Sequence, residues 1–145
     1  MTGVTRSAIF AVAVFAFAFS VGHLVDAEPV QSQEAETVFE MRTYTTHEGK
    51  LPNLLARFRD HTMRIFEKHG MTNVGYWVPQ DAPLSDNTLI YIISHESREA
   101  ADRNWSAFRS DPEWQRVVED SQRDGEIVSS VVRVFMSATD FSPIE

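Results

Sequence analysis

The order of apolar and polar residues divides the chain into a strongly apolar beginning and a mixed remainder. Residues 8–19 read AIFAVAVFAFAF, and one basic residue, Arg6, precedes them. The run is followed by Val25-Asp26-Ala27, which resembles the small-residue pattern before a signal peptidase cut. We therefore expect residues 1–27 to be a signal peptide cleaved after Ala27, and the protein to be exported to the periplasm or secreted.

The alternative for this segment is an uncleaved membrane anchor from Ala8 to Val25. That stretch is at the short limit for crossing a bilayer, and it contains His23. After cleavage no stable membrane anchor is expected. Residues 28–36, EPVQSQEAE, are polar and acidic and predict a flexible linker, so the folded domain is expected over residues 37–145.

Periodicity predicts the first half of this domain. Residues 38–45 (VFEMRTYT) are rich in β-branched and aromatic side chains that alternate between two faces, which predicts a strand. Apolar residues at helical spacing over 51–69 predict a helix that ends at Gly70. Strands are expected at 72–78 and 88–94, separated by turn-forming residues over 80–87.

The second half predicts two helices and a last strand. Ser97 is the expected cap of one helix, and Asp111 followed by Pro112 is a strong start for the next, which is expected to end near Gly125. Residues 127–139 predict the longest strand. We expect no internal repeat.

The resulting order, β-α-β-β-α-(α)-β, predicts an α+β, ferredoxin-like domain with a four-stranded antiparallel sheet and helices on one face. The third and fourth strands are apolar on both sides, so the bare face of the sheet needs a partner. We expect a homodimer in which two sheets pack face to face as a dimeric α+β barrel.

Composition then excludes several classes of function. The chain has 13 Lys and Arg against 21 Asp and Glu, a net charge of −8, which opposes binding to nucleic acid. It has no cysteine, which excludes disulfides, thiolate metal sites and thiol nucleophiles. The sequence has no serine-hydrolase elbow, phosphate loop, dinucleotide fingerprint or twin-arginine signal, so no cofactor is expected.

The histidines expected in the mature chain do not predict a metal site. None of His47, His61, His69 and His95 has a partner at metal-ligand spacing, and structural or solvent roles are favoured for them. His95 is the hardest to set aside because it ends the third predicted strand, where polar groups converge beside a sheet–helix pocket.

Three polar side chains, Glu40, Arg42 and Tyr44, align on one face of the first predicted strand. A buried ion must be paired or used, which leaves two interpretations. Glu40 and Arg42 could form a structural ion-pair network at the dimer seam, or Arg42 and Tyr44 could donate hydrogen bonds to an anionic or carbonyl-bearing ligand. A one-residue register error would exchange this set with the residues at 39, 41 and 43.

The aromatic content favours an apolar ligand if a pocket exists between sheet and helices. Most of these rings are expected in the core, but Tyr76, Trp77, Tyr91 and Trp105 would make such a pocket flat and suited to an aromatic or quinone-like molecule.

The motifs of the domain resemble those of the NIPSNAP family. The resemblance runs from Val38 to about Val118 and includes FEMRTY at 39–44, FEKHG at 66–70, GYW at 75–77 and the distinctive DPEW at 111–114. It implies a dimeric α+β barrel, whose superfamily includes cofactor-free monooxygenases acting on aromatic substrates. The resemblance implies no particular set of catalytic residues. The predicted export signal argues against an intracellular role for this chain.

Three functions follow as hypotheses. The first is a homodimer that binds a small aromatic or carbonyl-containing molecule, which Arg42 and Tyr44 orient. The second is a cofactor-independent monooxygenase or isomerase in which His95 or His61 is the base and Tyr44 or Tyr91 stabilises an oxyanion. The third is a structural or protein-interaction module, favoured if the space between sheet and helices is solidly packed.

Overall fold

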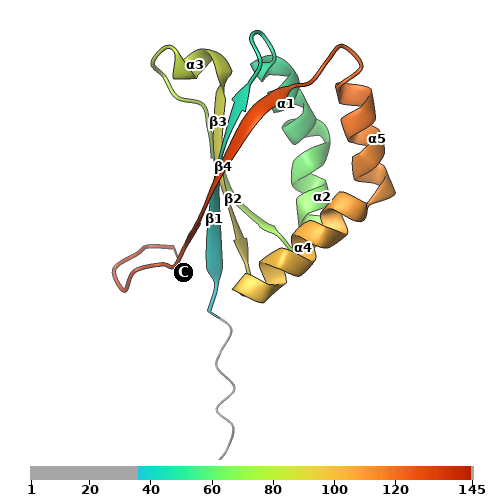
Figure 1. The fold of residues 1–145 in the computed structure, drawn as a ribbon. Helices are drawn as coiled ribbons and strands as arrows, with labels where there is room; N and C mark the ends of the chain where they lie inside the picture. Colours follow the sequence, from blue (N-terminus) through green and yellow to red (C-terminus); the bar gives the residue numbers. More distant parts are fainter. Residues whose placement is uncertain (1–35, 145) are drawn as a thin grey trace, which may run out of the picture. The chain divides into compact units, whose positions relative to one another are not determined.

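A computed structural model of the chain describes residues 36–144, so the predicted signal peptide and nearly all of the linker lie outside the described residues. The described part contains one four-stranded antiparallel sheet with the spatial order β2-β3-β1-β4. This order is that of the predicted ferredoxin-like fold, and the α+β class is confirmed. Helices α1, α2, α4 and α5 lie on one side of the sheet (Figure 1).

The strands form where the alternating pattern predicts them, with small shifts at their ends. They are β1 (Val38–Thr46), β2 (Thr72–Trp77), β3 (Thr88–His95) and β4 (Val128–Met136). β4 is shorter than the predicted strand over 127–139. The register places Arg42 opposite Tyr91 on one side and Arg133 on the other, which fixes the face that each residue of β1 occupies.

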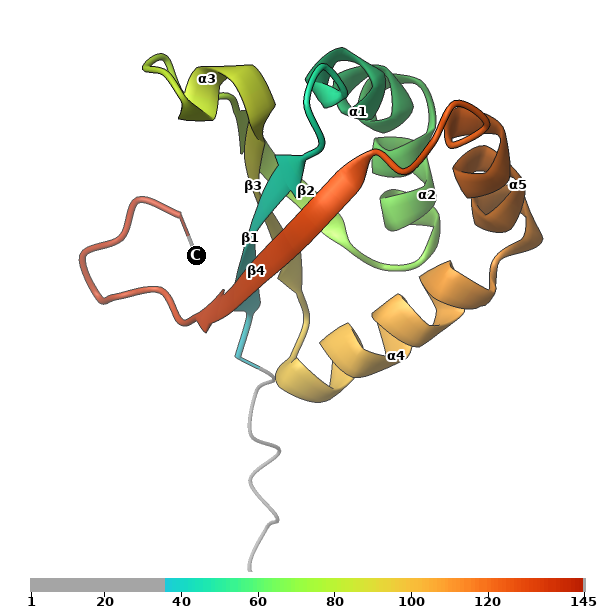
Figure 2. The same cartoon turned by 45° about the horizontal axis from the view of Figure 1, so that its top comes forward.

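The register decides which residues of β1 face the helices, a question that the sequence left open. Glu40 is fully buried against helix α4, and Arg42 and Tyr44 share its face because side chains alternate along a strand. Phe39, Met41 and Thr43 therefore point to the opposite face, away from α1, α2, α4 and α5 (Figure 2).

The predicted helix over 51–69 contains an interruption of its hydrogen-bond pattern. It consists of α1 (Leu51–Arg57), a π-helical segment η1 (Phe58–Thr62) and α2 (Met63–Lys68). The Thr62 hydroxyl donates to the Arg57 carbonyl at 3.1 Å inside this segment. Such π-helical insertions occur frequently at functional sites. Gly70 follows with φ of +74°, as expected for the residue that ends a helix.

The predicted caps of the other two helices are confirmed. Helix α4 (Arg98–Ser110) starts at Ser97, whose hydroxyl accepts from the Ala100 amide at 3.1 Å. Helix α5 (Pro112–Ser121) starts at Asp111, whose carboxylate accepts from the Glu113 amide at 2.8 Å. The segment predicted as a loop over 80–87 is not entirely irregular, because its end forms the short helix α3 (Leu84–Asn87).

The core lies between the sheet and the helices. Its buried side chains come from α1, η1 and α2, from β3 and from Ile127 just before β4, and α4 adds two aromatic rings. Six of the larger members are Leu54, Phe58, Ile65, Phe66, Tyr91 and Phe108. Burial of these side chains is the main favourable contribution to folding.

The other face of the sheet is apolar and half exposed. Val132 and Val134 of β4 expose 60% and 42% of their surface, and Trp77 of β2 exposes 51%. Residues after β4 return along this face, where Ser142 and Ile144 help line a hollow of about 270 Å³ together with Phe39 and Ile92. The cartoon shows this C-terminal segment on the side of the sheet away from the helices (Figure 2).

Candidate functional site

A buried carboxylate, Glu40, is the centre of a polar cluster between β1, β3 and α4. The indole N–H of Trp105 donates to Glu40 Oε2 at 2.6 Å, and His95 Nε2 lies 3.0 Å from the same oxygen. Arg42 Nε lies 3.7 Å from the other oxygen, Oε1, which is an ion-pair distance but too long for a hydrogen bond. Glu40, His95 and Trp105 expose at most 5% of their surface.

The two hydrogen-bond contacts of His95 indicate which of its ring nitrogens donates and which accepts. The Asn104 amide nitrogen lies 3.4 Å from His95 Nδ1 and also donates to the Gly70 carbonyl at 2.9 Å. Because an amide nitrogen only donates, Nδ1 must accept, so the ring proton is on Nε2 and is donated to Glu40. Both ring nitrogens of His95 are therefore engaged within the protein.

The cluster keeps Glu40 ionised. Burial alone would raise the pKa of the carboxyl, but the hydrogen bonds from His95 and Trp105 and the charge of Arg42 outweigh it and hold the pKa below its usual value. A buried carboxylate with this many partners fixes the positions of the side chains around it.

Arg42 lies between aromatic rings. Its guanidinium carbon is 4.1 Å from the ring centroid of Trp105 and 5.5 Å from that of Tyr44. The side chain is 15% exposed, so the guanidinium is largely removed from water. Contacts of this type stabilise a cation over a ring and also hold its plane in a fixed direction.

Tyr91 lies opposite Arg42 in the register and belongs to an aromatic cluster. Its ring is 5.3 Å from that of Tyr44, 5.1 Å from that of Phe58, and stacked on Tyr76 at 5.4 Å with an interplanar angle of 18°. Burial raises the pKa of the Tyr91 phenol well above its usual value, so the hydroxyl stays a neutral donor.

Several buried polar atoms in this region have no hydrogen-bond partner. Among the described residues these include Arg42 Nε and the Tyr91 hydroxyl, both donors, and Glu40 Oε1, an acceptor. An unpaired buried polar atom costs free energy, and such atoms are uncommon in native proteins. Two neighbouring donors without an acceptor favour a ligand that supplies a carbonyl or anionic oxygen.

The structure brings together most of the residues that the sequence singled out. Glu40, Arg42 and Tyr44 of β1 share a face with Tyr91 and His95 of β3 and Tyr76 of β2, and Trp105 of α4 closes the cluster. The Glu40–Arg42 pair therefore faces the helices, and the prediction that it lies at a seam between sheets is wrong.

Two of the singled-out residues lie apart from this cluster. Trp77 points to the open face of the sheet, because side chains alternate along β2 and Tyr76 points to the helices. Its ring covers Gly75, where an added Cβ would come to 2.5 Å from the ring, so a side chain at this position would displace the Trp77 ring. His61 lies in η1, where it lines a separate groove beside α5.

One residue of this region, Arg57 at the end of α1, was not predicted from the sequence. It is 7% exposed, and its Nε is a further buried donor without a partner. Burial lowers the pKa of the Arg57 guanidinium from its usual value. The helical spacing offered a weak signal, since Arg57 falls between the apolar residues Leu54 and Phe58 on the inward side of the helix.

Metal and membrane signals are also negative within the described part of the chain. Over residues 36–144 no three His, Asp or Glu side chains gather closely enough to hold a metal ion. None of the helices in that range has the length and apolar content needed to cross a membrane.

Comparison with known proteins identifies similar folds. Residues 39–143 match the model of the NIPSNAP family. A NIPSNAP family protein of unknown function from Agrobacterium tumefaciens is 24% identical with a TM-score of 0.66, over 76% of this chain and 95% of that one. A NIPSNAP-like domain protein from Burkholderia xenovorans is 19% identical with a TM-score of 0.64, over 74% and 90%.

A more distant solved structure is that of an enzyme. SnoaB, a cofactor-independent oxygenase from Streptomyces nogalater, is 16% identical with a TM-score of 0.51, over 75% of this chain and 99% of that one. At this identity the likeness concerns the fold alone. No curated protein shows a significant sequence match to this chain.

Proposed function

This chain belongs to the NIPSNAP family, and from its buried polar cluster we propose that it binds a small aromatic molecule carrying a carbonyl or anionic oxygen. The observation that carries the proposal is the pair of neighbouring buried donors, Arg42 Nε and the Tyr91 hydroxyl, that lack an acceptor. Arg42 and Tyr44 orient the ligand oxygen, and the surrounding rings of Tyr91 and Trp105 contact its flat apolar part.

The homodimer is part of this proposal. The open face of the sheet exposes Val132, Val134 and Trp77, and a monomer in water would leave this apolar surface uncovered. Two copies packed by these faces bury it and leave the Arg42 cluster on the helix side of each subunit. Export directed by the N-terminal signal is the last part of this proposal. It is compatible with the absence of cysteine from the chain.

Catalysis is the second candidate function. The buried Tyr91 hydroxyl favours it, since a neutral donor in a low-dielectric site stabilises an oxyanion. His95 does not suit the role of base because both of its ring nitrogens are engaged by Glu40 and Asn104. His61 lines a different groove, so we assign no general base and place binding first.

A binding measurement with one probe tests the first candidate. We choose 2-hydroxy-1,4-naphthoquinone, a flat aromatic molecule with two carbonyls and an acidic hydroxyl, and follow quenching of tryptophan fluorescence. We expect saturable binding to the wild type and a weakening of roughly tenfold or more in Tyr44→Phe or Arg42→Lys, since a hydrogen bond to a charged group contributes about 1.5–3 kcal/mol.

Controls separate binding from folding. Tyr44→Phe removes one oxygen and keeps the ring, so its circular dichroism spectrum and Tm should match the wild type. Equal affinity in wild type and both variants would contradict the proposed site.

Native mass spectrometry of the protein recovered from the exported fraction tests the rest. A dimer starting at Glu28 and carrying an added small mass supports dimer, export and ligand together, whereas a monomer contradicts the barrel.

A further inference from the structure

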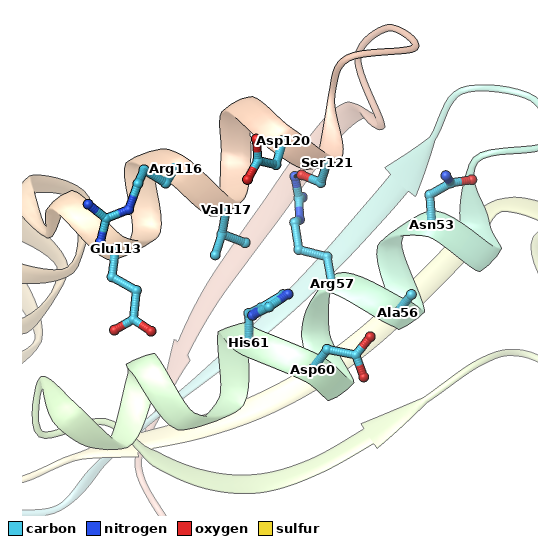
Figure 3. Close-up of a pocket in the computed structure, with 10 residues that line it drawn as sticks. All are labelled: Asn53, Ala56, Arg57, Asp60, His61, Glu113, Arg116, Val117, Asp120 and Ser121. Carbon is cyan, nitrogen blue, oxygen red and sulfur yellow. Dashed lines mark hydrogen bonds between the residues drawn. The ribbon is translucent and has the colours of Figure 1, made fainter.

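A groove runs between α1–η1 and α5, on the outer side of Arg57. It encloses about 570 Å³, within the range of small-molecule sites, and its polar lining includes Asp60, His61, Arg116, Asp120 and Ser121 in addition to Arg57. Figure 3 shows Arg57 reaching from α1 toward Ser121 on α5, with His61 between the two helices. We refer to this feature as the α1–α5 groove.

Arg57 is the unusual member of the lining because it is a buried cation without a counter-ion. It is 7% exposed, and among the described residues no carboxylate lies within ion-pair distance of it. Its contacts are a long hydrogen bond from Nη1 to the Ser121 hydroxyl, 3.4 Å, and the ring of Trp114 at 5.5 Å. Nε has no partner.

The groups behind Arg57 do not supply the missing negative charge. Burial lowers the pKa of Arg57, and the nearby Tyr91 phenol is neutral because burial raises its pKa. A buried charge without a counter-ion is costly, so a native protein either pairs it or uses it. Since the groove borders Arg57, an anion in the groove could pair with it.

None of the three carboxylates that line the α1–α5 groove, those of Asp60, Glu113 and Asp120, lies within ion-pair distance of Arg57. Glu113 pairs with Arg64 and, at 3.5 Å, with Lys68. Asp120 pairs with Arg123 at 2.5 Å. Within the described part of the chain, Asp60 has no ion pair, so each carboxylate of the lining is either paired elsewhere or too far from Arg57 to neutralise it.

The π-helical segment brings two groove residues into line. Arg57 immediately precedes η1, and His61 follows it by four residues inside the segment. A wider helix turn places residues at this spacing nearly above each other, and both side chains are directed toward α5 (Figure 3). The Thr62 hydroxyl bonds the Arg57 carbonyl, which supports the unusual turn.

We infer that the α1–α5 groove binds a small organic monocarboxylate, whose carboxylate pairs with the guanidinium groups of Arg57 and Arg116. A guanidinium matches a carboxylate in planar, two-pronged geometry. Ala56 and Val117 provide an apolar wall for the rest of the ligand. This site is additional to the one proposed around Arg42.

Sodium benzoate is the probe for this inference. We would titrate it into the full chain labelled with ¹⁵N and follow backbone amide shifts. Saturable shifts are expected at Ala56, His61, Val117 and Ser121, with an affinity reduced at least tenfold in Arg57→Gln.

The matched control is Arg59→Gln, which removes the same charge two residues away at an exposed position outside the groove lining and should bind benzoate like the wild type.

Two further variants distinguish the α1–α5 groove from the Arg42 site and from a folding defect. Tyr44→Phe should leave benzoate shifts in the groove unchanged, so loss of the Arg42 site and loss of this site can be told apart. If Arg57→Gln does not fold, the exposed Arg116→Gln replaces it, with a weakening of several-fold expected. The inference fails if the groove amides do not shift, if Arg59→Gln weakens binding as much as Arg57→Gln, or if inorganic phosphate displaces benzoate at equal concentration.

Discussion

Arg42 and Arg57 are two buried arginines on the same side of one sheet, but their surroundings differ. Arg42 of β1 lies 3.7 Å from the Glu40 carboxylate and 4.1 Å from the centre of the Trp105 ring. Arg57 of α1 is more deeply buried, yet its one hydrogen bond is the 3.4 Å contact with Ser121. The protein supplies a counter-ion for the first guanidinium and none, within the described residues, for the second.

The difference shows that burial of a charge does not have a single meaning. The charge of Arg42 belongs to a network with Glu40, His95 and Trp105 that joins two strands to a helix. Removing a member of such a network leaves the others buried and unpaired. No charged partner of Arg57 would be left unpaired by its removal. Its charge therefore contributes to ligand binding more than to folding stability. Substitutions around Arg42 should therefore destabilise the protein much more than a substitution of Arg57 does.

The largest effect is expected for Glu40→Leu. It leaves Arg42 without a counter-ion and removes the acceptor for His95 and Trp105, so the free energy of unfolding should fall by about 3–5 kcal/mol. Urea unfolding followed by fluorescence measures it. The exposed Glu48→Leu serves as control and should change stability by less than about 0.5 kcal/mol. A loss at Glu40 no greater than at Glu48 would contradict the role of the network.

Arg42→Met should cost somewhat less, about 2 kcal/mol. Glu40 would stay buried but would keep its hydrogen bonds with His95 and Trp105. The double variant Glu40→Leu/Arg42→Met provides the check, because its loss should be smaller than the sum of the two single losses if the pair interacts.

Trp105→Phe is expected to destabilise by about 1–2 kcal/mol. It keeps an aromatic ring beneath Arg42 but deletes the 2.6 Å hydrogen bond from the indole to Glu40. Thermal unfolding measures the change. The partly buried Trp114→Phe, which removes no described hydrogen bond to a carboxylate, should lower Tm by less.

A pH series identifies the contribution of the Glu40 charge. The folded pKa of Glu40 is lowered from its usual value of 4.5, so the unfolded chain binds more protons and the stabilisation is complete above that value. It is lost progressively as the pH falls from about 4.5 through the folded pKa. In urea titrations the stability difference between wild type and Glu40→Gln should therefore shrink on acidification, and a constant difference would contradict ionisation of Glu40.

Arg57→Met should have the smallest effect on stability, a change within about 1 kcal/mol or a slight gain. Replacing an unpaired buried cation by an apolar side chain of similar length removes a desolvation cost and keeps the packing. Urea unfolding of Arg57→Met and Arg42→Met side by side tests the comparison directly. A loss at Arg57 as large as that at Arg42 would indicate that Arg57 has a counter-ion after all.

Much of the fold was predictable because local rules determine it. Alternation identified the four strands, Ser97 and Asp111 cap helices as expected, and Gly70 has the positive φ that ends a helix. The π-helical turn at Phe58–Thr62 was not predicted, because its apolar spacing is that of an ordinary helix. Short helix α3 arose from residues that are also typical of turns.

The candidate site was predictable in its membership more than in its arrangement. Alternation along β1 grouped Glu40, Arg42 and Tyr44, and the structure adds Tyr91 beside Arg42 through the strand register. No local pattern indicated that Trp105 would donate to Glu40, since the two residues are 65 positions apart. Arg57 was missed because one basic residue within a helical pattern is ordinarily exposed.

The sequence by itself determined which residues form strands and helices, the family, and the set of polar side chains that share one face of the first strand. These properties depend on neighbours two to four residues apart, which the sequence displays directly. Only the tertiary structure decided that this face meets the helices, that Arg42 has a counter-ion, and that Arg57 has none within the described chain. Pairing and burial of charges depend on contacts between distant segments, and local periodicity does not encode them.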